Sequence, residues 1–531
     1  MKHVLLLHLI LFLLPWRAGA TEIIPGKAYR INSCFAGSKA LFMKDATLSD
    51  GVNVISWTET SVPAQRWIAS DAGDGFLFLT NAYSGRQLAK NINRGADNDP
   101  IVLKSNAPTY CKWELVPVQN PAYPNAYYIC FSVKSNNVPL CIEIADAAEG
   151  SQVKAQLKRT DADSIRQMWT VVAEDVLPNR VTPAFRDSVM RGWKARYFNA
   201  LKTSTGFWGE AEMMETLLDA YETTGKQEYR TMFQEVYEHF VSYPAGWGQS
   251  GNGQDWRWND FNDDMAWAVL ASVRAYLMFG THPNSGINYR TIAKNNFDWM
   301  YNRALQTGGT LKWHETIPNG SNSCINGPAE IAACYLAIAT GDDTYCDKAK
   351  NLYAKQRQYL YNPNTGEVYD SGSWNDSFTV FTVGNRWVST YNQGTFLGAA
   401  LMLYKRYGDA QYLNDAHKIA ERTRSNLCNT LGVVSACGSG DDLEGFKGIL
   451  MRYLRRYVVD LALPDKVEWL QRNALHAYNN RSSKGVSWTA WWEKTAEGFI
   501  FDNYNNDKPF GCSTAVSAAF NAPLSADLII K

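Results

Sequence analysis

The sequence predicts a multidomain chain in which an all-β domain precedes an all-α domain. Its length is the first observation, because 531 residues exceed the size at which a single hydrophobic core stops growing. A change of hydrophobic period is the second. Residues 22–175 read as short strands separated by turn residues, whereas beyond residue 183 apolar residues recur every three or four positions. A Pro-bearing segment joins the two parts, so we expect a β domain at 22–175 and a helical domain at 183–531.

The β domain contains a unit that recurs three times. Each copy runs from a turn through alternating apolar residues and a polar loop to a tryptophan, at Trp67, Trp113 and Trp169. A unit of this size cannot bury its apolar face alone, so neighbouring copies must share a core. We therefore expect the three indoles to lie together at the centre of the domain.

This threefold pattern resembles the ricin-type β-trefoil lectins. The family's Gln-x-Trp motif is matched by the triplets that end at Trp67 and Trp169, and a degenerate copy ends at Trp113. In such lectins an acidic residue early in each repeat holds a sugar hydroxyl, and the resemblance implies this role for Glu143 in the third repeat. The first two repeats have no carboxylate at that place. The alternative is that the trefoil is a spacer or a docking module, because a fold alone does not establish a function.

Helical hairpins recur in the second half of the chain. Four of their turns fall at Gly225, Gly280, Gly341 and Gly408. Two further pairs of helices are expected, one around 444–478 and one that combines the segment from residue 184 with the tail at 513–522. Six pairs of this length can close into a toroid whose inner helices start near one face and leave a groove there.

The composition excludes several classes of partner. Lys and Arg total 52 and Asp and Glu total 52, so the chain has no net charge with which to attract nucleic acid or anionic lipid. Aromatic residues make up 13%, with 19 Trp and 28 Tyr, and their flat faces suit the stacking of uncharged sugar rings. The ten Cys and seven His show no zinc spacing, so we expect neither a metal nor another cofactor.

The first twenty residues predict a secretory signal. An early Lys is followed by an apolar run at 4–14 and by a small-residue ending, with cleavage expected after Ala20. Cysteine usage fits an oxidising compartment. Beyond the signal no other apolar run approaches the length of a membrane span, so we expect a secreted or periplasmic monomer without membrane insertion.

Two adjacent carboxylates, Asp263 and Asp264, precede an apolar stripe and are expected in the first turn of a helix. They could simply cap the helix, a use worth about 1 kcal/mol, but one aspartate would suffice for that. Two neighbours repel each other, which raises the proton affinity of one of them. One ionised and one protonated carboxyl are the groups that glycoside hydrolysis requires.

The spacing of the two carboxylates predicts the stereochemistry. Adjacent side chains reach a separation of about 5 Å more readily than the wider gap that an inverting enzyme needs for its water. We therefore expect retention through a covalent glycosyl intermediate. Trp256, Trp258 and Trp267 surround the pair and offer faces on which neighbouring sugar rings can stack, with the alternative that Trp267, inside the helix, belongs to the core.

The segment "FNDDMAW" at 261–267 resembles the Asp-Asp motif of glycoside hydrolase family 76, endo-α-1,6-mannanases with an (α/α)6 barrel. Segments at 207–225, 324–342, 390–409 and 444–454 resemble the family in the same order. The resemblance implies that Asp263 is the nucleophile and Asp264 the acid/base, while the residues alone leave the reverse open.

Five further side chains are expected to bind mannose hydroxyls: Glu212, Asn326, Tyr391, Asn392 and Gln393. For each of them the alternative is that it caps a helix or satisfies buried backbone. The long aromatic segment at 362–390 can wall one end of the groove. Asp376 lies in that segment, but nothing in the sequence places it in the groove.

The leading interpretation is a secreted retaining endo-α-1,6-mannanase that hydrolyses the backbone of α-mannan or mannooligosaccharides. One alternative is a transglycosidase that acts on cell-wall mannan and passes the covalent sugar to another glycan. The other is a non-catalytic protein that only binds glycans.

Overall fold

The computed structural model describes residues 23–528 apart from 26, 38, 45–49, 60–62, 92–96, 106–107, 124, 175–179, 205, 243–252, 438–442 and 498–506. The chain divides into two compact units, Met1–Leu177 and Pro178–Lys531. The predicted signal segment lies outside the described residues. Among the described helices, none is long and apolar enough to cross a lipid bilayer.

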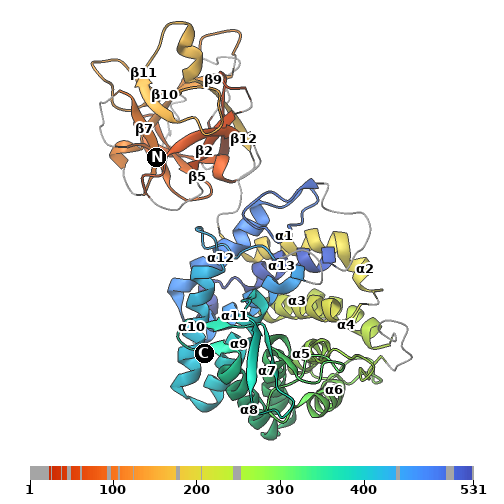
Figure 1. Cartoon of the computed structure of the whole chain (residues 1–531). Coiled ribbons are helices and arrows are strands. Elements are labelled where there is room, and N and C mark those ends of the chain that lie inside the picture. Colours follow the sequence, from red (N-terminus) through yellow and green to blue (C-terminus); the bar gives the residue numbers. More distant parts are fainter. Residues whose placement is uncertain are drawn as a thin grey trace, which may run out of the picture. The chain divides into compact units, whose positions relative to one another are not determined.

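The first unit is an all-β domain, as predicted (Figure 1). Its described residues form the strands β1 (Ala28–Ser33), β2 (Lys39–Met43), β3 (Val54–Thr58), β4 (Arg66–Gly73), β5 (Phe76–Asn81), β6 (Gln87–Lys90), β7 (Asp99–Lys104), β8 (Trp113–Pro117), β9 (Ala126–Phe131), β10 (Leu140–Ile144), β11 (Val153–Leu157) and β12 (Met168–Glu174). All of their pairings are antiparallel. A disulfide between Cys130 and Cys141 joins β9 to β10.

The strand pairing repeats along the chain. β1 pairs with β4 and β12, β5 with β4 and β8, and β9 with β8 and β12, so these strands follow one another around a closed ring. The strands between them form the hairpins β2–β3, β6–β7 and β10–β11. Each third of the domain therefore contributes two ring strands and one hairpin.

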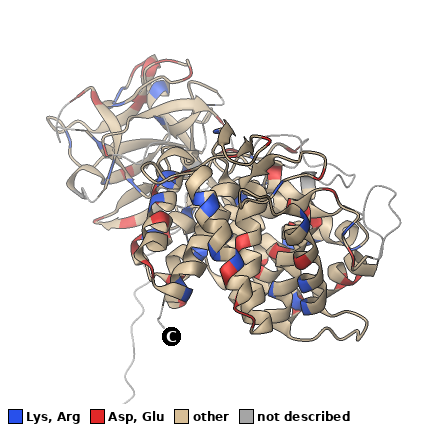
Figure 2. Cartoon of the chain, turned by 60° about the horizontal axis from the view of Figure 1, so that its bottom comes forward, with Lys and Arg blue, Asp and Glu red and all other residues tan. Residues whose placement is uncertain are grey.

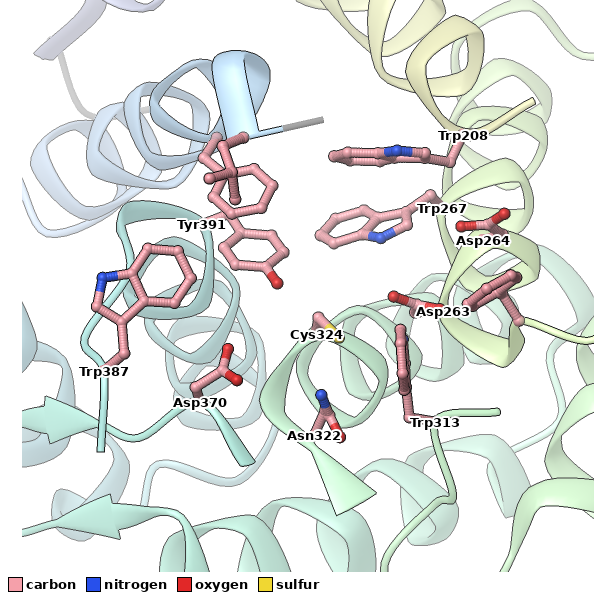
Figure 3. A pocket seen from close by; sticks show the side chains of 13 residues that line it. Trp208, Asp263, Asp264, Trp267, Trp313, Asn322, Cys324, Asp370, Trp387 and Tyr391 are labelled. Atoms are coloured by element: carbon pink, nitrogen blue, oxygen red, sulfur yellow. The ribbon is translucent and has the colours of Figure 1, made fainter. Parts of the chain in front are cut away.

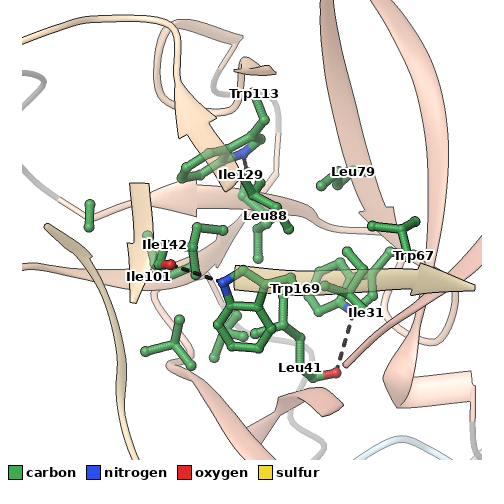
Figure 4. Close-up of a cluster of buried hydrophobic side chains, with 14 of the residues drawn as sticks. Ile31, Leu41, Trp67, Leu79, Leu88, Ile101, Trp113, Ile129, Ile142 and Trp169 are labelled. Atoms are coloured by element: carbon green, nitrogen blue, oxygen red, sulfur yellow. Dashed lines mark hydrogen bonds between the residues drawn. The ribbon is translucent and has the colours of Figure 1, made fainter. Parts of the chain in front are cut away.

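The three repeat tryptophans occupy one core, which confirms the prediction. Trp67, Trp113 and Trp169 are fully buried and belong to the same hydrophobic cluster (Figure 4). Each indole N–H donates to a backbone carbonyl on the first strand of a hairpin, 25 to 27 positions earlier in the chain, over 3.3, 2.8 and 2.9 Å: Leu41, Leu88 and Ile142. The indoles thus fill the core and also satisfy their own donors.

The second unit is helical. Its described helices are α1 (Pro183–Trp193), α2 (Asn199–Leu201), α3 (Trp208–Thr224), α4 (Gln227–Ser242), α5 (Asn262–Phe279), α6 (Tyr289–Ala304), α7 (Ser323–Thr340), α8 (Thr344–Tyr359), α9 (Thr390–Tyr407), α10 (Ala410–Asn426), α11 (Phe446–Asp460), α12 (Pro464–Asn479) and α13 (Asp507–Asn521). Short strands accompany them: β13 (Gly320–Asn322), β14 (Tyr361–Asn362), β15 (Glu367–Val368), β16 (Ser371–Trp374) and β17 (Phe381–Asn385).

The inner helices close into a ring. α3, α5, α7, α9, α11 and α13 contact one another in this order, and α13 in turn contacts α3. Helices α4, α6, α8, α10 and α12 each pack against the inner helix that precedes them in the chain, and α1 packs against α13 (Figure 1). The predicted toroid of helical pairs, including the pair formed by the two ends of this domain, agrees with this arrangement.

Glycine ends four of the inner helices, as the sequence predicts. Gly225, Gly280, Gly341 and Gly408 follow α3, α5, α7 and α9 with φ of 66°, 72°, 72° and 69°. Residues with a Cβ adopt this left-handed region at a cost, so glycine stops each helix and lets the chain turn back.

A buried carboxylate, Asp219 on α3, ties the first inner helix to three others. Nη2 of Arg274 on α5 lies 2.9 Å from Oδ1 of Asp219. Nε of Arg452 on α11 lies 2.9 Å from Oδ2, and Nδ2 of Asn521 on α13 donates to the same Oδ2 over 2.9 Å. All four side chains are buried, so these bonds join the first and last inner helices where the ring closes.

Glu212 and Glu215 of α3 extend this network. Glu215 lies 2.8 Å from Arg274, and Glu212 lies 2.9 Å from Arg452. Burial raises the pKa of Glu212 to about 7, although Arg452 acts to lower it. Removing one member of such a network leaves an uncompensated charge inside the protein.

Arg452→Met should lower the free energy of unfolding by about 3–5 kcal/mol, because the buried carboxyl groups of Asp219 and Glu212 would lose the cation that faces both of them. Urea denaturation followed by circular dichroism measures the change. The matched control is Lys405→Met, which removes an exposed partner of Asp460 at 3.1 Å and should cost less than about 1 kcal/mol. Equal effects of the two variants would contradict a special role for the buried network.

Candidate active site

A pocket of about 500 Å3 lies where the inner helices begin (Figure 3). Trp208 is the first residue of α3, and Phe446 is the first residue of α11. The lining comprises Trp208, Phe261, Asp263, Asp264, Trp267, Trp313, Asn322, Cys324, Asp370, Trp387, Tyr391, Leu443 and Phe446. Inner helices that run in the same direction thus direct their N-terminal ends at a single cavity.

Asp263 and Asp264 line this pocket from the first turn of α5, and their predicted place in a first helical turn is confirmed. The segment before the helix is held in place. The backbone N–H of Asn262 donates to the carbonyl of Trp313 over 2.9 Å, and Nδ2 of Asn259 donates to Oδ2 of Asp264 over 3.0 Å. The carboxylate pair therefore projects from a fixed backbone.

Burial controls the charge of Asp263. It raises the pKa of this carboxyl to about 6, while the neighbouring Cys324 thiol and Trp313 indole act to lower it. The positive end of the α5 dipole also favours a negative charge at this position. At neutral pH Asp263 is therefore mostly ionised, but close enough to its pKa to respond to small changes around it.

Aromatic side chains from several helices form one wall of the pocket. The rings of Trp267 and Tyr391 stack with centroids 6.3 Å apart, and Tyr391 stacks on Phe446 at 3.6 Å. Trp208 adds a tilted contact with Trp267 at 6.0 Å. A wall of this kind presents flat apolar faces beside the carboxylates, which suits an uncharged ring-shaped ligand with polar edges.

A third carboxylate, Asp370, lines the pocket and was not predicted. It lies just before β16, and Asn385 and Asn392 donate amide hydrogens to it over 3.2 and 3.3 Å. Burial raises its pKa. The prediction that 362–390 walls the groove is confirmed by Asp370 and Trp387, whereas Asp376 is exposed and does not line the pocket.

A small antiparallel sheet, β13–β16–β17, carries this wall. The backbone N–H of Ser323, at the start of α7, donates to the carbonyl of Asp370 over 2.8 Å. The indole N–H of Trp374 donates to Oγ1 of Thr310 over 2.9 Å. The sheet is thus fastened to α7 and to the segment between α6 and β13, and it holds Asp370 opposite the α5 carboxylates (Figure 3).

Two predicted substrate-binding tryptophans do not line the pocket. Trp256 is fully buried, with its ring 5.8 Å from Phe207 and 5.9 Å from Phe240. Trp258 packs edge-on against Phe207 at 5.3 Å. The tryptophans that line the pocket are instead Trp208, Trp267, Trp313 and Trp387.

Three predicted polar residues also lie away from the pocket. Glu212 belongs to the buried charge network. Oδ1 of Asn326 accepts the backbone N–H of Leu311 over 3.0 Å, and Oε1 of Gln393 accepts that of Val368 over 2.7 Å. These side chains satisfy buried groups, so for them the alternative of a purely structural role holds.

The remaining predicted residues fall into two groups. Tyr391 lines the pocket, and Asn392 reaches it only through Asp370. Glu143, in the β domain, is buried and lies 2.7 Å from Nε of Arg159, while Nε2 of Gln167 donates to it over 2.9 Å.

Within the described chain, no group of three or more His, Cys, Asp or Glu side chains has the arrangement of a metal site.

Comparisons with known proteins agree with this geometry. The family model Glycosyl hydrolase family 76 matches residues 185–526. A comparison with curated proteins gives no match. The alpha-1,6-mannanase from Salegentibacter sp. HEL1_6 is 26% identical, with a TM-score of 0.54, over 64% of this chain and 99% of that structure.

Two further solved structures are informative. An inactive variant of the Salegentibacter mannanase, with two consecutive aspartates replaced by alanine, is in complex with alpha-1,6-mannotetrose. It is 25% identical over 64% of this chain and 98% of that structure, with a TM-score of 0.54. Dfg5 from Chaetomium thermophilum, in complex with glucosamine, is 16% identical over 63% of this chain and 89% of that structure, with a TM-score of 0.52, and shares the fold. Because the family model matches well over half of the sequence, the chain belongs to glycoside hydrolase family 76.

Proposed function

We propose that this glycoside hydrolase is a retaining endo-α-1,6-mannanase. The observation that carries the proposal is the pair of consecutive aspartates, Asp263 and Asp264, facing an aromatic pocket from the first turn of α5. The similar mannanase that is inactive when two consecutive aspartates are replaced supports the importance of such a pair. The α-1,6-linked mannan substrate rests on the same comparison.

Asp263 acts as the nucleophile in this proposal. Its carboxylate attacks the anomeric carbon, the glycosidic C–O bond breaks, and Asp264 donates its proton to the departing oxygen. Asp264, now ionised, removes a proton from water, whose oxygen displaces Asp263 and releases the sugar with its original stereochemistry.

The pocket chemistry favours an uncharged glycan. Its walls are aromatic apart from one leucine, three carboxylates, an amide and a thiol. Lys and Arg are interspersed with Asp and Glu over the helical domain (Figure 2). Asp370, opposite the catalytic pair, can accept hydrogen bonds from sugar hydroxyls. Trp387 beside it is 46% exposed and offers a face to a sugar ring.

The N-terminal domain we assign to the ricin-type β-trefoils. The repeated strand pairing and the equivalent bonds of the three core indoles support this assignment. The ion pair between Glu143 and Arg159 favours a structural role for Glu143, so its binding of sugar stays a prediction. The predicted signal and the Cys130–Cys141 disulfide support export to the periplasm or the exterior.

Asp263→Ala and Asp264→Ala should each abolish cleavage of debranched yeast mannan without loss of the folded state. On a mannoside with an activated leaving group, Asp264→Ala should recover much of its rate, because such a group needs no proton. Asp263→Ala should not recover. Product formation and circular dichroism are the measurements.

The control for these variants is Asp376→Ala, which changes an exposed aspartate of the same domain and should keep the wild-type rate. Wild-type rates for both pocket variants would contradict the site. A wild-type protein that binds mannan but never cleaves it would favour the non-catalytic alternative.

The acid limb of kcat/KM should lie near pH 6, because Asp263 must be ionised to attack. Below that pH its carboxyl is protonated and activity falls. Cys324→Ala should move the limb to higher pH, because the thiol stabilises the charged carboxylate. Cys346→Ala, a buried cysteine on α8 that does not line the pocket, is the control and should leave the limb in place. A limb that stays or moves to lower pH in Cys324→Ala would contradict this account.

Hydrolysis and transglycosylation are separated by the products. With short α-1,6-mannooligosaccharides added as acceptors, a hydrolase should yield only fragments shorter than its substrate. A transglycosidase should build longer chains, because the acceptor hydroxyl replaces water at the covalent intermediate. Mass spectrometry of the products distinguishes these outcomes, and a ladder of elongated products as the main fraction would favour the transglycosidase.

A further inference from the structure

A second hollow lies on the outer side of the helical ring, where none of the proposed catalytic residues is found. It has a volume of about 610 Å3, and the segment at 254–257 and the exposed face of α6 line it. The side chains that matter for the argument are Gln254, Asp255, Asn295, Asp298, Trp299 and Asn302.

Trp299 is the central feature of this hollow. Its side chain is 45% exposed, although its neighbours on α6, Phe297 and Met300, are fully buried. The helix is therefore anchored in the core without this indole. Arg257 lies 5.3 Å from the ring centroid, which steadies the indole at the surface. A large aromatic side chain held in this way beside a cavity is a platform for a flat ligand.

The rim of the hollow is polar. Asn295 and Asn302 lie one turn before and one turn after Trp299 on the same exposed face of α6. Their side-chain amides make no hydrogen bond to the part of the chain that the structure describes. Each amide can donate and accept, as the hydroxyls of a sugar require.

The charges around the hollow are matched. Asp298 lies 2.7 Å from Nζ of Lys294, and Asp255 forms an ion pair with Arg257. The hydroxyl of Tyr345 also donates to Asp298 over 2.8 Å. The carboxylates are thus occupied, so the hollow has no excess charge with which to select an ionic ligand.

One segment of the chain borders both the hollow and the active-site pocket. Nδ2 of Asn296 on α6 donates to the carbonyl of Gln254 over 2.9 Å, and its Oδ1 accepts the N–H of Trp256 over 2.8 Å. Nε of Arg303, also on α6, donates to Oδ1 of Asn262 over 2.8 Å. The same stretch of chain therefore borders the hollow at one end and carries Asp263 at the other.

We propose that this hollow is a secondary binding site for the mannan polymer. A mannose ring stacks on Trp299, and its hydroxyls bond to Asn295 and Asn302. The inference rests on the proposed mannanase function for the identity of the glycan. A polymer held at this site stays near the pocket, which raises its effective concentration there, whereas a short oligosaccharide gains nothing from it.

The test is Trp299→Ala in the full-length enzyme. KM for polymeric α-1,6-mannan should rise at least about threefold with kcat unchanged, because only retention of the polymer is lost. kcat/KM for α-1,6-mannotetraose should stay at the wild-type value. The control is Tyr407→Ala, which removes another exposed aromatic side chain, 40% exposed at the end of α9. It should leave both substrates unaffected.

Binding gives an independent readout. In the Asp263→Ala/Asp264→Ala background, adding Trp299→Ala should reduce depletion of the protein by insoluble mannan, and adding Tyr407→Ala should not. An unchanged KM for the polymer, or an equal loss on polymer and tetraose, would overturn the secondary site. Failure of the mannanase proposal gives a different result, because the wild-type protein would then cleave neither substrate. In that case the depletion measurement alone would test whether the hollow binds mannan.

Discussion

One buried aspartate closes the helical ring. Asp219 on α3 accepts bonds from α5, α11 and α13, and so joins the first inner helix to the last ones. The ends of this domain are far apart in sequence, and hydrophobic contact alone does not distinguish one helical neighbour from another. A carboxylate between two guanidiniums demands particular partners, because any other pairing leaves a charge buried without compensation. The ring geometry, and with it the pocket, depends on these bonds being made together.

The bonds of Asp219 lie further along the inner helices than the pocket does. Asp219 lies in the second half of α3, and Asn521 is the last residue of α13. The pocket residues Trp208, Asp263 and Tyr391 lie in the first turns of α3, α5 and α9. The bonds that close the ring therefore lie away from the helix starts that form the pocket. The N-termini of the inner helices converge on the pocket and favour negative charge there. Burial of Asp263 opposes that effect, and the balance leaves its pKa at about 6.

Local patterns made the architecture predictable. The change of period, the turn glycines such as Gly225 and Gly341, and the repeat tryptophans of the β domain each depend on a few neighbouring residues. The position of Asp263 and Asp264 was predictable for the same reason, because a helix start has a sequence signature.

The rest of the site depends on contacts between distant segments. The inner helices are buried on nearly all sides, so a polar residue such as Asn326 or Gln393 has no periodic signature that tells a pocket position from a buried one. Glu212 was misplaced for this reason, since its partner Arg452 lies far along the chain. Asp370 enters the pocket only because β16 pairs with β13 and β17, which nothing near Asp370 in the sequence reveals.

The β13–β16–β17 sheet forms one wall of the pocket but is not part of the helical ring. The ring supplies the rigid frame, while the β16–β17 hairpin of the wall leaves that frame after α8 and returns to it before α9. Lengthening such a connection costs little closure entropy. Insertions and deletions in this hairpin can therefore reshape one side of the pocket while the carboxylate pair and the helical ring stay unchanged.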